Sequence, residues 1–175
     1  MDALIWLFET LLSLCLIAAL LRLLLQWSRA DFRNQLARSI VQLTNPVIVP
    51  LRRLLPAIGR LDTASCVAVV AFALVEVSVR WLLSGLGPPP PLVWLQLAAF
   101  EILRTALWVY FFSIMTYALL SLIAPGTYSP AQDLLVALCE PVLRPFRRLI
   151  PPLGGIDFSP LWACIVIQML LILLR

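Results

Sequence analysis

Apolar residues dominate the chain in long runs, and most polar residues gather in the segments between those runs. A helix needs about 20 such residues to cross a bilayer. Four runs approach or reach that length, at residues 3–25, 64–83, 103–124 and 158–174. The third helix could begin earlier, near Leu92. Because the runs are continuous rather than alternating, they favour helices over barrel strands. The pattern predicts an all-α integral membrane protein with four transmembrane helices.

A Gly/Pro linker at residues 85–91 separates the second run from the third and includes four consecutive prolines. Proline lacks the amide hydrogen that a helix interior requires, so this segment cannot continue a helix. We expect a stiff, extended connection here. The linker predicts a division of the chain into residues 1–84 and 92–175.

A proline- and arginine-rich motif occurs twice without a gap, at an offset of 95 residues. The shared positions are Pro46, Pro50, Arg52, Arg53, Pro56, Gly59 and Asp62 in the first copy, and Pro141, Pro145, Arg147, Arg148, Pro151, Gly154 and Asp157 in the second. Each copy stands between two apolar runs. Since one span intervenes between the first and third spans, those two must cross in the same direction. The sequence therefore predicts two parallel tandem repeats, each with an Arg/Pro segment at the membrane interface.

Several features of this segment suggest its local structure. The first proline is suited to a helix start and the later one to bending or ending a short helix. The glycine would permit the turn into the next span, and the aspartate would cap that span by accepting from its free amides. Adjacent arginines point about 100° apart on a helix. The pairs Arg52–Arg53 and Arg147–Arg148 either bind anionic lipid or an acidic partner, or act as topology signals and snorkelling anchors.

The distribution of arginine predicts the orientation of the chain. Arginines are numerous in the loop after the first span and in the loop after the third, while residues 84–96 between the second and third spans contain none. Positive residues favour the cytoplasmic side. Both Arg/Pro loops should therefore be cytoplasmic and both termini periplasmic, in a bacterial inner membrane.

Charged residues interrupt the apolar runs at a few positions, where they are costly and usually paired. Glu76 and Arg80 are four residues apart and Glu101 and Arg104 are three apart, so each pair shares a helix face. With Glu9 they predict a salt-bridged cluster in the outer leaflet. A structural tie or interfacial snorkelling is one interpretation, and an ion or proton pathway is the other.

Composition narrows the function classes. Of 175 residues, 62% are hydrophobic, which is more than a soluble domain of this size can bury. The net charge is +4, and every basic residue is an arginine. Because the sequence has no histidine, the commonest metal and haem ligand is missing. The four cysteines match no zinc spacing and are interpreted as buried free thiols. No nucleophile stands beside a base and no phosphate-binding loop occurs. We expect a non-enzymatic protein without cofactor or metal, and with no nucleic acid partner.

The duplicated motif, followed by an apolar helix, resembles the YggT family, called YlmG in some lineages. The resemblance covers nearly the whole chain and is to the two-repeat form of many proteobacteria. The second copy, ending in Asp157-Phe158-Ser159-Pro160, is nearer the family pattern, whereas the first has Asp62-Thr63-Ala64. The family resemblance implies links to osmotic or ionic stress, to division-gene neighbourhoods, and, in plastids, to cytochrome assembly and nucleoid distribution.

Three hypotheses for function follow. The chain is a membrane scaffold or assembly factor that supports envelope, osmotic or ionic homeostasis, a subunit of a small oligomeric ion channel or transporter, or a protein that organises anionic lipid and is linked to division or cytochrome assembly. Its expected partners are membrane lipids, a membrane protein or further copies of itself.

Overall fold

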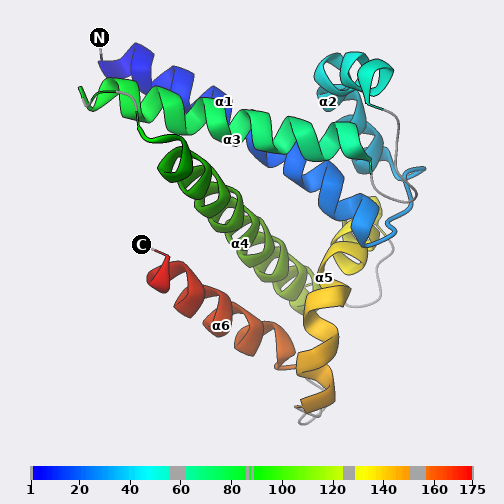
Figure 1. Cartoon of the computed structure of the whole chain (residues 1–175). Coiled ribbons are helices and arrows are strands. Elements are labelled where there is room, and N and C mark those ends of the chain that lie inside the picture. Colours follow the sequence, from blue (N-terminus) through cyan, green and yellow to red (C-terminus); the bar gives the residue numbers. More distant parts are fainter. Residues whose placement is uncertain are drawn as a thin grey trace. The chain divides into compact units, whose positions relative to one another are not determined.

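The computed structural model describes residues 2–55, 62–85, 87, 89–123, 129–149 and 157–174. These residues form six α-helices and no strand (Figure 1). The helices are α1 (Asp2–Trp27), α2 (Gln35–Leu54), α3 (Thr63–Leu83), α4 (Pro91–Ile123), α5 (Pro130–Leu149) and α6 (Ser159–Leu173). The all-α prediction is confirmed for the described part of the chain.

Three of the predicted spans are long and apolar enough to cross a membrane, namely those in α1, α3 and α4. They indicate a membrane protein. The fourth predicted span is a shorter apolar helix, because α6 has 15 residues and a length of about 22 Å. A hydrocarbon core is about 30 Å thick, so the crossing of α6 stays a prediction.

Helix α4 is longer than the third apolar run because it begins at Pro91 and has 33 residues. Proline is well tolerated at the first position of a helix, where its missing amide hydrogen would have had no partner. Glu101 and Arg104 consequently lie ten or more residues inside the helix, instead of near its start. At about 50 Å, α4 exceeds what a perpendicular crossing needs.

The described chain divides into two compact units. Unit 1 comprises residues 1–23 and 40–106, and contains most of α1, the second part of α2, all of α3 and the first part of α4. Its core joins Ile48 of α2 to Ala64 and Ala68 of α3. These small alanines allow the two helices to approach closely.

Unit 2 comprises residues 24–39 and 107–175, and contains the rest of α4 together with α5 and α6. Its core joins Ile114 of α4, Cys139 and Leu143 of α5, and Ala163 and Ile167 of α6. All five side chains are at most 5% exposed. The amphipathic helix α5 thus packs its apolar face on two apolar helices.

Candidate functional site

The Arg/Pro segments form the last turns of two amphipathic helices, α2 and α5, each 20 residues long. Here the prediction of a short helix that starts at the first proline is wrong. Pro46 and Pro50 lie inside α2, and Pro141 and Pro145 lie inside α5. The prolines are tolerated because tertiary packing holds the helices, as the 1% exposure of Ile48 and of Leu143 shows.

Helix α2 ends at Leu54, and Leu55 then precedes a proline in the sequence. A residue before proline is disfavoured in the α conformation, which explains the end of the helix. The predicted roles of Pro56, Gly59, Pro151 and Gly154 lie outside the described residues.

In unit 1, Arg52 binds Asp62 with two hydrogen bonds across the α2–α3 connection. Arg52 Nε donates to Asp62 Oδ1 at 3.2 Å, and Nη2 donates to Oδ2 at 2.5 Å. Ser65 Oγ also donates to Oδ2, at 2.7 Å. Burial alone would raise the pKa of Asp62, which is 3% exposed, but the hydrogen bonds from Arg52 and Ser65 outweigh it and lower that pKa. Asp62 is therefore ionised at neutral pH and holds the end of α2 on the start of α3.

In unit 2, Arg147 makes the corresponding bond from α5 to the residues before α6. Its Nε donates to Asp157 Oδ2 at 2.9 Å and its Nη1 donates to Glu140 Oε2 at 2.5 Å. Nη2 donates to the Tyr117 hydroxyl at 3.0 Å. Burial raises the pKa of Asp157, yet hydrogen bonds from Ser159 and Arg147 lower it overall. One guanidinium thus joins α4, α5 and the start of α6.

The two aspartates differ in the capping role expected of them. Asp62 occupies the N-cap position of α3, but its carboxylate makes no hydrogen bond to a backbone amide there. The capping prediction is wrong for Asp62, whose two oxygens accept from Arg52 and Ser65 instead. Asp157 Oδ1 does accept from the Ser159 amide at 2.9 Å, at the first residue of α6.

The second arginine of each pair is not bonded to the aspartate. Arg53 and Arg148 are exposed and form no ion pair with any described residue. Adjacent positions on a helix point about 100° apart, so only one arginine of a pair can reach the carboxylate. Each pair therefore divides into an arginine that binds the aspartate, Arg52 or Arg147, and an exposed one without an ion pair among the described residues.

Arg22 of α1 belongs to the site in unit 1, although it lies inside the first apolar run and is not among the site residues predicted from the sequence. It is 4% exposed. Its Nη1 donates to Thr44 Oγ1 at 2.8 Å, to Asn45 Oδ1 at 3.0 Å and to the Val41 carbonyl at 3.4 Å. No described carboxylate lies within ion-pair distance of it. The 95-residue offset of the repeat could have pointed to Arg22. It aligns Arg22 with Tyr117 and Asn45 with Glu140, and both members of each aligned pair belong to the arginine site of their unit.

Three of the five charged residues that were predicted to form a cluster lie together in unit 1. Arg80 Nη2 donates to Glu76 Oε1 at 2.5 Å, and its Nη1 donates to Glu101 Oε2 at 2.8 Å. Ser13 Oγ of α1 donates to Glu76 Oε1 at 2.6 Å. Glu9 and Arg104 form no ion pair within the described part of the chain. The contacts join α1, α3 and α4, and leave the buried Glu76 Oε2 without a hydrogen-bond partner among described residues.

The cysteines only partly match their interpretation as buried thiols. All four are free, but Cys15 is exposed, Cys66 and Cys164 are half-buried, and Cys139 alone is buried. Burial raises the pKa of Cys139 to about 12, so it stays a neutral thiol. The described residues hold no group of three His, Cys, Asp or Glu side chains that could bind a metal ion.

Comparison with known proteins finds one matching family model and several similar proteins. The sequence model of the CCB3/YggT family matches residues 1–83 and 96–175. An uncharacterised protein of Pseudomonas aeruginosa is 39% identical over 172 residues, which are 96% of this chain and 86% of that protein. The uncharacterised YggT protein of Escherichia coli K12 is 34% identical over 161 residues, covering 92% of this chain and 83% of that one.

A chloroplast relative shares a shorter stretch. The YlmG homolog protein 2 of Arabidopsis thaliana is 53% identical over 34 residues, 19% of this chain and 14% of the plant protein. No solved structure matches the chain.

Proposed function

The chain belongs to the CCB3/YggT family, and from this premise we propose that it is a non-enzymatic scaffold or assembly factor of the bacterial inner membrane. In this role it supports envelope, osmotic or ionic homeostasis by presenting two arginine-bearing helices, α2 and α5, to partners at the cytoplasmic surface. The single observation that carries the proposal is the arginine–aspartate bond that recurs in both units, Arg52–Asp62 and Arg147–Asp157.

The proposed topology has α1, α3, α4 and α6 crossing the membrane as two parallel repeats, with both termini periplasmic. The bounds of α2 and α5 support it, since they differ by 95 residues at each end, the same offset as the repeated motif. The distribution of arginine supports the cytoplasmic placement of these two helices. An amphipathic helix in the headgroup layer keeps its apolar face on the protein and lipid and its arginines at the surface.

The bond to aspartate matters because it makes the end of each helix rigid. A free loop would lose conformational entropy when it bound a partner, whereas a helix already held in place loses little. Arg52 and Arg147 hold the helix, and Arg53 and Arg148 are left exposed beside them. Exposed guanidinium groups suit an acidic protein surface.

Site-specific photo-crosslinking tests this proposal in cells that produce the full-length chain. A photoreactive residue replaces Arg53 or Arg148, and a matched control replaces Leu82, which is 78% exposed near the other end of α3. We expect a discrete protein adduct of the same mass at both arginine positions and none at Leu82. Arg147→Gln should weaken the adduct at position 148, since α5 is no longer held. Adducts to lipid alone would contradict a scaffold and favour the lipid-organising alternative.

One observation favours the ion-pathway alternative, namely the buried carboxylate oxygen of Glu76 that has no partner among described residues. Such an oxygen could take up a proton or a cation. Sodium, potassium or proton flux into liposomes that contain the purified protein, abolished by Glu76→Gln, would support this alternative over the scaffold.

A further inference from the structure

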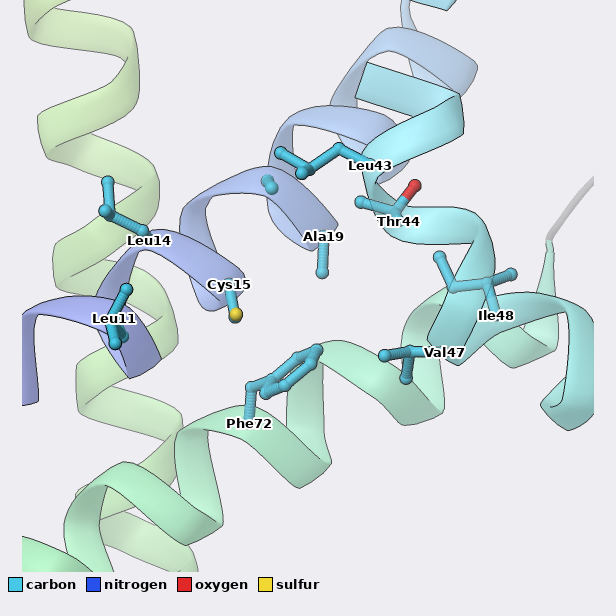
Figure 2. A pocket seen from close by; sticks show the side chains of 10 residues that line it. Leu11, Leu14, Cys15, Ala19, Leu43, Thr44, Val47, Ile48 and Phe72 are labelled. Carbon is cyan, nitrogen blue, oxygen red and sulfur yellow. The ribbon is translucent and has the colours of Figure 1, made fainter. Parts of the chain in front are cut away.

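An apolar pocket of about 270 Å³ opens in unit 1 among α1, α2 and α3 (Figure 2). Leu11, Leu14 and Cys15 line it from α1, Val47 from α2 and Phe72 from α3. Among the described residues of the lining, Thr44 of α2 alone has a side-chain oxygen or nitrogen. The pocket is therefore suited to a hydrocarbon ligand with a polar group at one end.

Two small residues of the pocket, both in α1, align with larger residues in the second repeat, whereas Leu11, Leu14 and Phe72 align with smaller ones. The 95-residue offset aligns Cys15 with Tyr110 and Ala19 with Ile114. Ile114 is 0% exposed and belongs to the core of unit 2. The offset also aligns Leu43, which lines the pocket and is 72% exposed, with Leu138, which is 3% exposed. Cys15 and Ala19 on α1 are thus smaller than the residues aligned with them, and one of those residues, Ile114, fills the core of unit 2.

The lining and the location of the pocket indicate its occupant. The described lining is apolar apart from Thr44, and a volume of about 270 Å³ can take part of a single hydrocarbon chain. Because α1 and α3 are long and apolar enough to cross a membrane, lipid acyl chains are the apolar molecules that would surround these helices.

The polar end of the pocket has a net positive charge nearby. Arg22 Nη1 donates to Thr44 Oγ1 at 2.8 Å, and the other partners of Arg22 are the neutral Asn45 and the Val41 carbonyl. The nearby Arg52 and Asp62 neutralise one another. The charge of Arg22 therefore has no carboxylate of its own within ion-pair distance among the described residues. This charge favours a ligand whose headgroup is anionic.

We propose that this pocket binds one acyl chain of an anionic phospholipid, with its phosphate toward Thr44 and Arg22. The chain lies along α1 between Leu11 and Ala19, which are about 12 Å apart on the helix axis. Bound in this way, the lipid supplies to unit 1 the apolar packing that Tyr110 and Ile114 supply to unit 2. The proposal does not depend on the scaffold function.

The test uses the full-length protein in nanodiscs with a phosphatidylglycerol that carries a diazirine on one acyl chain. After irradiation, mass spectrometry maps the adducts. We expect adducts on the pocket residues of α1, α2 and α3. The double variant Cys15→Tyr/Ala19→Ile places the residues of unit 2 in the pocket. Excluding two or more methylene groups should lower these adducts by about tenfold. Adducts on exposed Met169 and Leu173 of α6 should not change and serve as the control.

Competition tests the preference for an anionic headgroup. Unlabelled phosphatidylglycerol should displace the probe at a concentration about fivefold lower than phosphatidylcholine, and Arg22→Gln should remove this difference. If the double variant fails to fold, a chain in which Cys15 is the one remaining cysteine gives the same information. Phosphatidylglycerol in the pocket should slow the alkylation of Cys15. Equal pocket adducts in the wild type and the double variant would overturn the proposal, as would a Cys15 alkylation rate that is independent of lipid.

Discussion

At the scale of single residues, the arginine–aspartate contact that recurs in both units has different surroundings in each. Arg52–Asp62 and Arg147–Asp157 are the same pair of residue types at the same spacing. Asp62 is 3% exposed and depends on Arg52, whereas Asp157 is 39% exposed and its arginine also binds Glu140. An arginine stabilises a buried carboxylate more than an exposed one, because water cannot solvate the buried carboxylate when the arginine is removed.

This difference predicts the effect of removing each carboxylate charge. Asp62→Asn should lower the free energy of unfolding at pH 7 by about 1–2 kcal/mol, and Asp157→Asn by less than about 1 kcal/mol. The pKa of Asp62 is lower in the folded state, so its stabilisation is complete above the ordinary aspartate pKa of about 3.9 and is lost as pH falls through the folded value.

Denaturant unfolding in detergent at a series of pH values measures both effects. Asp62→Asn should unfold with less dependence on pH below 4 than the wild type. Equal stability losses for the two variants would show that burial of Asp62 has no energetic consequence.

At the scale of helices, ion pairs within unit 1 decide how α3 joins α4. Arg80 of α3 binds Glu76 in its own helix and Glu101 in α4. Trp94 of α4 adds a hydrogen bond from its indole nitrogen to Ser78 Oγ at 2.9 Å. Because one guanidinium serves two carboxylates, its removal leaves two acidic groups without a cation. The arginine therefore contributes more than either of its partners.

A double-mutant cycle tests this arrangement. Arg80→Gln should destabilise the protein by on the order of 3 kcal/mol, because Glu76 is 1% exposed and would keep an unpaired charge. Adding Glu76→Gln should restore much of that loss, while Glu76→Gln alone should have a smaller effect because Arg80 retains Glu101. Unfolding free energies of the four proteins give the coupling energy. A loss from Arg80→Gln that Glu76→Gln does not reduce would contradict the arrangement.

At the scale of the whole molecule, the proposed topology is set by the lipid solvent. Apolar helices remain in the hydrocarbon core, and arginine-rich segments stay in the cytoplasm. The two motif-bearing helices, α2 and α5, must then reach the same compartment, while the α3–α4 connection reaches the other one. The proposed parallel arrangement of the repeats requires this placement.

Cysteine labelling tests the topology in chains whose native cysteines are replaced by serine. Ser84→Cys should react with an impermeant maleimide in cells whose outer membrane alone is opened. Arg53→Cys and Arg148→Cys should react after the inner membrane is also opened. Early labelling of either arginine position, or different compartments for the two, would rule out parallel repeats with cytoplasmic Arg/Pro segments.

The amino-acid sequence by itself determined the helical character, the apolar spans of α1, α3 and α4, and the membership of the CCB3/YggT family. These properties follow from composition and from residue order along one segment. It was misleading about the prolines, because tertiary packing holds α2 and α5 as helices through positions that would break an isolated helix.

Only the tertiary structure decided which arginine of each pair binds the aspartate, and that Arg22 is buried against α2. It also decided that Arg80 binds Glu76 and Glu101, while Glu9 and Arg104 stay unpaired among the described residues. The pocket at Cys15 and Ala19 likewise depends on how α1, α2 and α3 pack. Local sequence specifies a helix and its apolar face, but contacts depend on how each helix is rotated against neighbours that are distant in the chain.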